Sequence, residues 1–258
     1  MRKTIGAIVQ ARMTSSRLPG KVLMPIDGTP MLAHQIYRIK QAKMLDKIIV
    51  STSTHETDNP ISELCNSIGV DLYRGSLEDV LDRFSKTANF FKVDSIVRLT
   101  ADCPLIDPGL IDKVIVGFLK NDYDYFSNCN PPTYPDGLDV EIFSKEVLTV
   151  AVENAKLPSQ REHVSPFIKR NLPKSKMGNL ESETNYSNLR WTVDEMSDLT
   201  FVREVFSELY INNNNFTWYD VLCLIKQKPN LLNINSKLVR NSGNRKSLEM
   251  DKKFLKND

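Results

Sequence analysis

Side chains that could bind an anionic group lie together near the start of the chain. Arg12, Arg17 and Lys21 are accompanied by two adjacent serines and by the pair Pro19–Gly20. Pro19 presets the backbone for the first central position of a turn, and Gly20 can adopt a positive φ at the second. A type II turn of this kind would aim Lys21 back toward the preceding residues. The three cations could then converge on a polyphosphate.

The position of this loop favours that interpretation over a solvated loop whose charges bind nothing. Residues 5–9 form a short, β-branched apolar run, which is typical of a buried strand. In open α/β sheets, ligands collect beyond the carboxyl ends of the strands. The sequence has neither a G-x-x-x-x-G-K-[ST] nor a G-x-G-x-x-G motif. We therefore expect neither a P-loop NTPase nor a nicotinamide dehydrogenase.

Two acidic residues, Asp102 and Asp194, follow short apolar stretches that predict strands, over residues 95–99 and 189–193. A carboxylate at such a strand end needs a cation, and Mg²⁺ carried in by a triphosphate would supply one. The alternative role is a helix cap. Asp107 suits the cap of the helix after Asp102 better, because a proline follows it directly. For Asp194 the residues leave both roles open.

A third acidic group, Asp136, Asp139 and Glu141, alternates with apolar residues beside a proline-rich loop. Such alternation describes an edge strand with a solvated acidic face. Carboxylates also accept paired hydrogen bonds from hydroxyl groups, so the same residues suit a polyhydroxylated sugar. The residues alone do not decide between the two.

These segments also resemble a known family. The run A-R-M-T-S-S-R-L-P-G-K, from Ala11 to Lys21, resembles the signature loop of the sugar nucleotidyltransferases. It is closest to the 3-deoxy-manno-octulosonate cytidylyltransferases and the SpsF-like cytidylyltransferases. Further motifs resemble theirs in the same order: L-T-A-D-C-P-L, Y-P-D-G-L-D-V-E, R-E-H-V and R-W-T-V-D. The resemblance covers residues 5–206, although this chain lacks the proline that the family usually has in the turn after Asp194.

The resemblance implies an enzyme that condenses CTP with an acidic sugar, similar to a sialic or octulosonic acid. The products would be pyrophosphate and a CMP-sugar for surface polysaccharide or glycan biosynthesis. The implied catalytic residues are Arg12, Lys21, Asp102 and Asp194, and the two acids would bind Mg²⁺ as the cofactor. The implied nucleotide-binding residues are Gln10, Ala11, Arg12, Ser16, Arg17, Lys21, Arg83 and Arg98. The implied sugar-binding residues are Asp136, Asp139, Glu141, Arg161 and His163. The alternatives are a transferase for another nucleotide and a sugar 1-phosphate, and a non-catalytic nucleotide-binding homologue.

The elements that must position these residues follow from the apolar spacing. Strands and amphipathic helices alternate through residues 5–119. This alternation predicts an α/β fold with a Rossmann-like, doubly wound, mainly parallel sheet that carries helices on both faces. Strands at 123–127 and 138–143 predict a small antiparallel extension. A single helix is predicted over 159–170, and two more follow at 196–210 and 217–226.

Length and composition predict one domain, residues 1–235, followed by a basic tail, residues 236–258. The resemblance implies that this domain is a nucleotidyltransferase domain. The tail has no apolar periodicity and holds seven Lys and Arg against three Asp and Glu. We expect it to be solvated rather than ordered. The net charge of the whole chain is +2, which predicts no general affinity for nucleic acid.

No apolar run reaches the roughly 20 residues that a bilayer-spanning helix needs, and the first run is too short for a signal-peptide core. We therefore expect a cytoplasmic protein without membrane insertion. The four cysteines are far apart and form no C-x-x-C pair, so we expect neither a zinc site nor a redox pair. The sequence does not define the oligomeric state, and a homodimer remains open.

Overall fold

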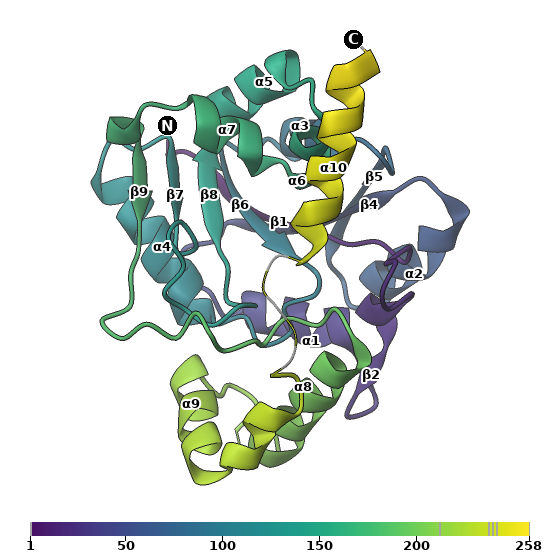
Figure 1. Ribbon diagram of the computed structural model, residues 1–258, viewed down its shortest axis with the longest axis vertical. Helices are drawn as coiled ribbons and strands as arrows, with labels where there is room; N and C mark the ends of the chain where they lie inside the picture. Colours follow the sequence, from purple (N-terminus) through teal and green to yellow (C-terminus); the bar gives the residue numbers. More distant parts are fainter. Residues whose placement is uncertain (1, 212, 237, 239, 241, 258) are drawn as a thin grey trace.

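The computed structural model describes residues 2–211, 213–236, 238, 240 and 242–257. These residues form a seven-stranded sheet in the order β5-β4-β1-β6-β8-β7-β9 (Figure 1). Four neighbouring strands are parallel: β5 (Asp71–Gly75), β4 (Lys47–Ser53), β1 (Ile5–Gln10) and β6 (Ser95–Thr100). In the middle of this group, β1 is buried over all of its residues except Gln10, as its apolar sequence predicts.

An antiparallel strand extends the sheet beyond β6. β8 (Glu141–Ser144) runs antiparallel to β6 on one side and to β7 (Tyr125–Ser127) on the other. β9 (Met177–Asn179) then pairs in parallel with β7. The register places Arg98 of β6 opposite Glu141 of β8. The predicted α/β fold with a small antiparallel extension is therefore confirmed.

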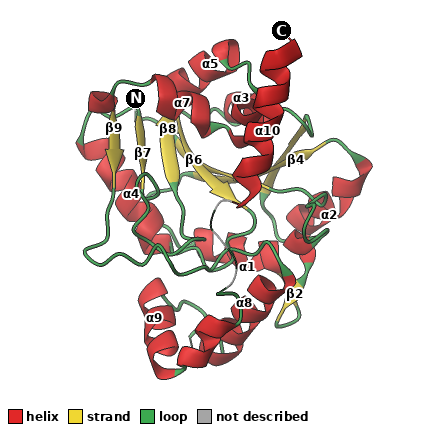
Figure 2. Ribbon diagram, in the orientation of Figure 1, coloured by secondary structure: helices red, strands yellow, loops and turns green. Residues whose placement is uncertain are grey.

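Helices cover both faces of the sheet (Figure 2). Alternate side chains of β1 enter different cores, because successive residues of a strand point to opposite faces. Val9 joins the core that α1 (Met31–Ile39), α2 (Asn59–Ser67) and α4 (Pro108–Lys120) cover. Ile8 joins the core that α3 (Val80–Phe90) and α5 (Lys145–Asn154) cover. None of the helices described here has the length and apolar character needed to cross a bilayer.

The helix predicted over residues 159–170 is instead two short helices. α6 (Pro158–His163) ends at Val164, which has a φ of 69°, and α7 (Ser165–Asn171) begins directly afterward. Pro166 explains the break, because proline lacks an N–H group and its ring clashes with the carbonyl of the preceding turn. The break lies next to His163, which faces the cavity described below.

A further core lies at the bottom of Figure 1, where α8 (Met196–Leu209) and α9 (Trp218–Gln227) pack together. The buried guanidinium of Arg38, on α1, links this core to the sheet. It donates hydrogen bonds to the carbonyl groups of Ile106 at 2.8 Å and Phe216 at 2.9 Å. It also stacks 4.3 Å from the centroid of the Phe216 ring. The remaining short elements are β2 (Pro25–Ile26), β3 (Thr29–Pro30), η1 (Lys21–Leu23), η2 (Glu56–Asp58), η3 (Lys174–Lys176) and η4 (Pro229–Asn233).

The structure differs from the expectation of a solvated tail, because residues 242–257 form the helix α10 (Ser242–Asn257). This helix packs against α6 (Figure 1). Among its described side chains, Ser247 and Asp251 are buried, whereas Phe254 and Leu255 are exposed. The described part of the docked face is therefore polar. Apolar periodicity cannot reveal a helix whose buried contacts are made by a hydroxyl and a carboxylate.

Candidate active site

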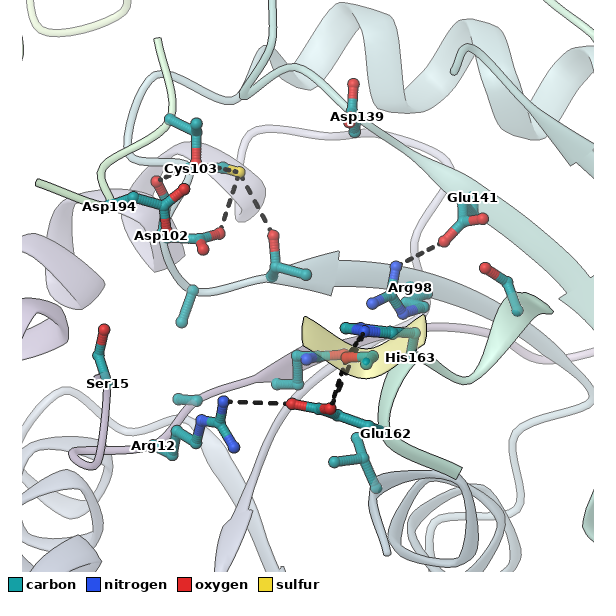
Figure 3. Close-up of a pocket in the computed structure, with 18 of the residues that line it drawn as sticks. Arg12, Ser15, Arg98, Asp102, Cys103, Asp139, Glu141, Glu162, His163 and Asp194 are labelled. Carbon is teal, nitrogen blue, oxygen red and sulfur yellow. Dashed lines mark hydrogen bonds and ion pairs between the residues drawn. The ribbon is translucent and has the colours of Figure 1, made fainter. Parts of the chain in front are cut away.

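A polar cavity of about 850 Å³ lies at the carboxyl ends of β1 and β6. Figure 3 shows acidic and basic side chains from distant parts of the chain facing each other across it. All but one of the residues predicted from the sequence line it: Gln10, Ala11, Arg12, Ser16, Arg17, Lys21, Arg83, Arg98, Asp102, Asp136, Asp139, Glu141, His163 and Asp194. The exception is Arg161.

Arg161 joins helices instead of lining the cavity, which corrects its predicted role in sugar binding. Its guanidinium pairs with Asp79, the N-cap residue of α3, and donates a hydrogen bond to the carbonyl of Val152 at 2.8 Å. The next two residues, Glu162 and His163, do line the cavity. Consecutive side chains on a helix point in different directions, so the R-E-H segment serves both purposes.

The loop after β1, residues 11–20, adopts the predicted turn. The N–H of Lys21 donates to the carbonyl of Leu18 at 3.2 Å, and Gly20 has a φ of 72°. The N–H of Gly20 also donates to the carbonyl of Met13 at 2.8 Å, which closes the loop on itself. A side chain at this positive φ would strain the backbone. The Pro–Gly pair thus fixes the point where Lys21 enters the cavity.

The buried carboxylate of Asp58 anchors the 11–20 loop, a role that the sequence analysis missed. One oxygen accepts from the N–H of Met13 at 2.8 Å. The other accepts from the N–H and hydroxyl of Ser53, at 3.1 and 2.5 Å, and from the hydroxyl of Thr52 at 3.0 Å. Burial alone would raise the pKa of Asp58, but these hydrogen bonds lower it below its ordinary value. Asp58 therefore ties the loop to the end of β4.

Lys21 lies between the two predicted metal ligands. Its Nζ contacts Asp102 Oδ2 at 3.1 Å, Asp194 Oδ1 at 2.9 Å and the carbonyl of Val193 at 2.7 Å. An ammonium group has three protons, so each has an acceptor. Burial alone would lower the pKa of Lys21, but Asp102 and Asp194 raise it. Lys21 is 7% exposed, so its ammonium is enclosed by these acceptors rather than surrounded by solvent.

Asp102 is held in its ionised form. Burial alone would raise its pKa, but the charge of Lys21 and hydrogen bonds from Thr100, Lys21 and Cys103 lower it to about 2. Burial raises the pKa of the neighbouring Cys103 well above its ordinary value, and the charge of Asp102 adds to that effect. Cys103 therefore remains a thiol, and its Sγ lies 3.4 Å from Asp102 Oδ1.

Asp194 is not the cap of α8. The N-cap residue is Glu195, and the carboxylate of Asp198 accepts hydrogen bonds from the N–H groups of Asp194 and Glu195 at 2.9 and 3.0 Å. The Asp194 carboxylate lines the cavity instead. There, Arg17 and Arg190 contact its Oδ2 at 2.8 and 2.9 Å. The structure thus decides against the cap role that the sequence left open.

The segment before Asp194 is not the predicted strand, because only Arg190 forms a bridge there, to Asp136. The buried guanidinium of Arg190 contacts both oxygens of Asp198, at 2.9 and 3.0 Å. It also contacts Asp136 Oδ2 at 3.1 Å. Arg190 therefore connects the acid beside Lys21 to the first of the predicted sugar-binding acids. Arg190 lies within the R-W-T-V-D motif, but the sequence alone predicts no role for it.

Glu141 is a buried anchor for two cations. Its carboxylate contacts Arg98 at 2.5 Å, Lys169 at 3.3 Å and the hydroxyl of Tyr125 at 2.6 Å. Burial alone would raise the pKa of Glu141, but Lys169, Arg98 and Tyr125 hold it well below its ordinary value. With only 3% of the residue exposed, Glu141 positions Arg98 and Lys169 at the cavity wall rather than offering its own oxygens.

Asp139 is the most accessible of the three predicted sugar-binding acids. Its side chain is 35% exposed, compared with 11% for Asp136 and 4% for Glu141. Asp139 contacts Arg240 at 2.6 Å. Burial raises the pKa of Asp136 to about 6 although Arg240 and Arg190 oppose that shift. Of the three, Asp139 is best placed to accept hydrogen bonds from a ligand.

Three buried polar atoms of lining residues have unused hydrogen-bonding capacity. Within the described part of the chain, Gln10 Oε1, Arg83 Nε and Arg98 Nε are buried and have no hydrogen-bond partner. Burial lowers the pKa of Arg83 to about 10, and its terminal nitrogen donates to the carbonyl of Ser76. Because a buried polar atom without a partner is costly, these atoms suit the polar groups of a ligand.

Other lining residues were not assigned from the sequence: Glu162, Ser165, Lys169, Thr192, Arg240, Ser247, Glu249, Met250 and Lys253. Glu162 lies inside the R-E-H segment, so that motif could have identified it. Lys169 and Arg240 lie outside the quoted motifs, and their sequence neighbours give no signal.

The donor set at Asp102 and Asp194 fits a divalent cation that arrives with a phosphate compound. A search of the described residues finds no group of three or more His, Cys, Asp and Glu side chains that could hold a metal. The two carboxylates do, however, converge on one cation, the ammonium of Lys21. Mg²⁺ is commonly bound by one or two carboxylates together with substrate phosphates and water.

Comparison with known proteins identifies related chains. The cytidylyltransferase family model matches residues 6–218. The spore coat polysaccharide biosynthesis protein SpsF of Bacillus subtilis is 32% identical over 208 residues, which cover 78% of this chain and 85% of SpsF. A cytidylyltransferase structure from Leptospira borgpetersenii has a TM-score of 0.85 and 32% identity, over 89% of this chain and 97% of that one. CMP:2-keto-3-deoxy-manno-octonic acid synthetase complexed with CTP shares the fold, with a TM-score of 0.62 and 18% identity over 80% and 99% of the two chains.

Proposed function

The chain belongs to the cytidylyltransferase family, and from that premise we propose that it transfers a cytidylyl group from CTP to an acidic sugar. One observation carries the proposal. The Asp102–Lys21–Asp194 cluster and the acids around Asp139 line a single cavity, whose volume of about 850 Å³ is in the range of small-molecule sites. Such an arrangement would bring two substrates together.

The 11–20 loop would hold the triphosphate. Arg12 is 45% exposed in its side chain, and its contact with Glu162 is long, at 3.5 Å. Contacts between exposed charges contribute little, so Arg12 can exchange Glu162 for a phosphate at small cost. Arg17 and Lys21 reach the cavity from the same loop. We assign these three residues to the phosphates and the unpaired atoms of Gln10 and Arg83 to the rest of the nucleotide.

Asp102 and Asp194 would hold Mg²⁺. When bound, this ion would offset phosphate charge and favour ionisation of the attacking hydroxyl. Lys21 would then be released from the two acids and could donate to phosphate oxygens. Arg190 would keep Asp194 in place throughout, because Asp198 fixes its guanidinium from the other side.

Asp139 would orient the hydroxyl groups of the acceptor. The positive charges of Arg98 and Lys169 would attract the acidic group of the acceptor. The acceptor oxygen would form a bond to the α-phosphorus of CTP as the bond to the bridging oxygen breaks. Pyrophosphate would leave, and the hydroxyl proton would be released. These steps need no covalent intermediate with the protein.

A pyrophosphate-release screen tests the proposal. It pairs each of the four nucleoside triphosphates with a panel of sialic-type and octulosonic acids and with sugar 1-phosphates. We expect release only with CTP and an acid. Release with another nucleotide, or only with a sugar 1-phosphate, would identify a different transferase. No release with any pair, while CTP still binds in calorimetry, would identify a non-catalytic nucleotide-binding homologue.

A further inference from the structure

The segment formed by Arg240 and α10 contributes to the cavity although it lies beyond residue 218, where the match to the family model ends. Arg240, Ser247, Glu249, Met250 and Lys253 all line the cavity. Figure 3 shows a turn of α10, in yellow, beside His163 and Glu162. The segment therefore forms part of the wall around the proposed site.

Arg240 controls Asp139, the most accessible of the three predicted sugar-binding acids. Its guanidinium donates to Asp139 Oδ1 at 2.6 Å and to the carbonyl of Tyr134 at 3.3 Å, and it lies 3.8 Å from Asp136 Oδ1. Asp136 and Asp139 carry like charges, so without Arg240 they would repel each other. With its side chain only 16% exposed, Arg240 holds Asp139 in one position.

Ser247 performs a similar role for two other lining residues. Its hydroxyl donates to Glu162 Oε2 at 3.0 Å and lies 2.8 Å from His163 Nε2. A hydroxyl has one proton, which Glu162 accepts, so the second contact requires His163 to donate from Nε2. Ser247 thus fixes both the direction of Glu162 and the tautomer of His163.

Asp251 fastens the helix that carries Ser247. Its buried carboxylate accepts from the N–H of Ser159 at 2.9 Å and from the hydroxyl of Ser159 at 2.5 Å. Asp251 is four residues after Ser247, and residues with this spacing lie on the same face of a helix. The two polar contacts hold α10 against α6 in a defined register.

We propose that Arg240 and Ser247 are positioning residues for the acceptor. Arg240 sets Asp139, and Ser247 sets Glu162 and His163, so the last segment of the chain helps to select which acceptor is used. This inference rests on the proposed function in assuming that the acceptor is a polyhydroxylated acid. Asp139 and His163 are the acceptor-side partners of these two residues, whereas Glu162 makes only a long, exposed contact with Arg12, which contributes little. This arrangement predicts a selective effect on the acceptor.

Steady-state kinetics and calorimetry test the inference. Arg240→Ala and Ser247→Ala should each raise the KM for the acid about tenfold, the effect expected for loss of one hydrogen bond to a charged group. The kcat and the affinity for CTP should remain close to wild type. Arg240→Lys and Ser247→Thr should restore most of the acceptor KM. Lys252→Ala is the matched control, because Lys252 is an exposed residue of the same helix.

An unchanged acceptor KM, or a loss of CTP affinity as large as the change in KM, overturns this inference but leaves the proposed function standing. If no acid is turned over, the proposed function fails, and direct binding then decides the inference. Saturation-transfer NMR with 3-deoxy-manno-octulosonic acid and N-acetylneuraminic acid, in the presence of CMP, supplies that measurement. Saturation-transfer signals that are present with the wild type and absent with Arg240→Ala support the inference. Signals that are equal in both proteins, or absent with the wild type, overturn it.

Discussion

At the scale of single residues, Lys21 combines two roles that substitution can separate. In Lys21→Ala the carboxylates of Asp102 and Asp194 face each other without their cation. Because breaking a buried ion pair leaves uncompensated charge, we expect a loss of stability on the order of 3 kcal/mol. Mg²⁺ should restore part of that loss and should raise the melting temperature of the variant more than that of the wild type. Thermal unfolding with and without Mg²⁺ measures this.

Arg12→Ala is the control for Lys21→Ala. Arg12 is exposed, so the melting temperature of the Arg12→Ala protein should stay at the wild-type value. Calorimetry should show that this variant binds CTP more weakly. If Mg²⁺ stabilises Lys21→Ala no more than the wild type, the two acids do not share a cation site.

Turnover of the acidic variants tests the shared site in another way. Asp102→Asn and Asp194→Asn should each remove most of the metal-dependent rate, and the double variant should lose little more. Groups that act as one unit give strongly non-additive losses. Glu195→Gln, at the N-cap of α8, should keep the wild-type response to Mg²⁺ concentration. If the two single losses multiply in the double variant, the acids act independently.

The sequence was sufficient to place Asp102 and Asp194 in one cavity, because each lies in a motif with a recognisable resemblance. It could not decide whether Asp194 caps α8. That depends on Asp198, four residues later, whose carboxylate accepts the two N–H groups that a cap would otherwise take. The position of Lys21 between the two acids could not be predicted either, because Asp102 and Asp194 are 81 and 173 residues away from Lys21 in the sequence.

At the scale of elements, Asp58 determines whether the 11–20 loop is held in place. Asp58→Asn replaces an acceptor oxygen with an NH₂ group facing N–H and O–H donors. We expect a loss of about 1 to 3 kcal/mol and weaker binding of CTP. The pKa of Asp58 is lowered on folding, so its contribution is complete above the unfolded pKa of about 3.9 and disappears as the pH falls through the folded pKa.

Urea unfolding of both proteins at neutral and at acidic pH measures this contribution. The difference in stability between wild type and Asp58→Asn should be large at neutral pH and should shrink below about pH 4. A difference that does not change with pH would show that the carboxylate charge is not the cause.

The loop between β7 and β8 depends on a glycine where it passes the backbone of residues 191 and 192. Gly137 has a φ of 106°, and a Cβ added there would lie 2.5 Å from the backbone nitrogen of Thr192 and 2.7 Å from the backbone carbon of Trp191. Gly137→Ala should therefore cost more than the conformational penalty alone, which is roughly 1 kcal/mol. Gly28→Ala is the control, because Gly28 has a φ of 74° and no neighbour within 4 Å of the added Cβ. Equal losses in chemical denaturation would contradict the close approach.

Among the elements, those with clear apolar periodicity were predicted well, and the exceptions have local causes. The helix over residues 159–170 is divided because Pro166 cannot continue it. The strand predicted over residues 189–193 does not form, because Arg190 is the one residue of that segment that makes a β-bridge, to Asp136. α10 was not foreseen because Ser247 and Asp251, the two residues buried among its described side chains, are polar.

At the scale of the whole molecule, Asp107 links the sheet to the core around α9. One oxygen caps α4 through the N–H of Leu110 at 2.9 Å, as predicted, and the other accepts from the N–H of Trp218 at 2.9 Å. Asp107→Ala should cost about 2 to 3 kcal/mol, because it removes a cap and a second buried hydrogen bond. Ser144→Ala, which removes only the cap of α5, should cost about 1 kcal/mol. Similar losses in denaturant unfolding would show that the second contact contributes nothing.

How the core around α8 and α9 is joined to the sheet could not be predicted from the sequence. The helices of this core were expected, but their docking depends on Arg38, a buried cation that donates to carbonyl groups and stacks on an aromatic ring. Local sequence gives no sign of such a residue, because an arginine on a helix is ordinarily at the surface.

The ammonium of Lys21 also has a kinetic consequence. It competes with free Mg²⁺ for Asp102 and Asp194, so the ion alone must displace a cation that already has three acceptors. An ion that arrives on a triphosphate brings new acceptors for the displaced lysine and avoids this competition. On the proposed function, we therefore expect the metal to enter together with the nucleotide, and we expect the protein by itself to have little affinity for the metal.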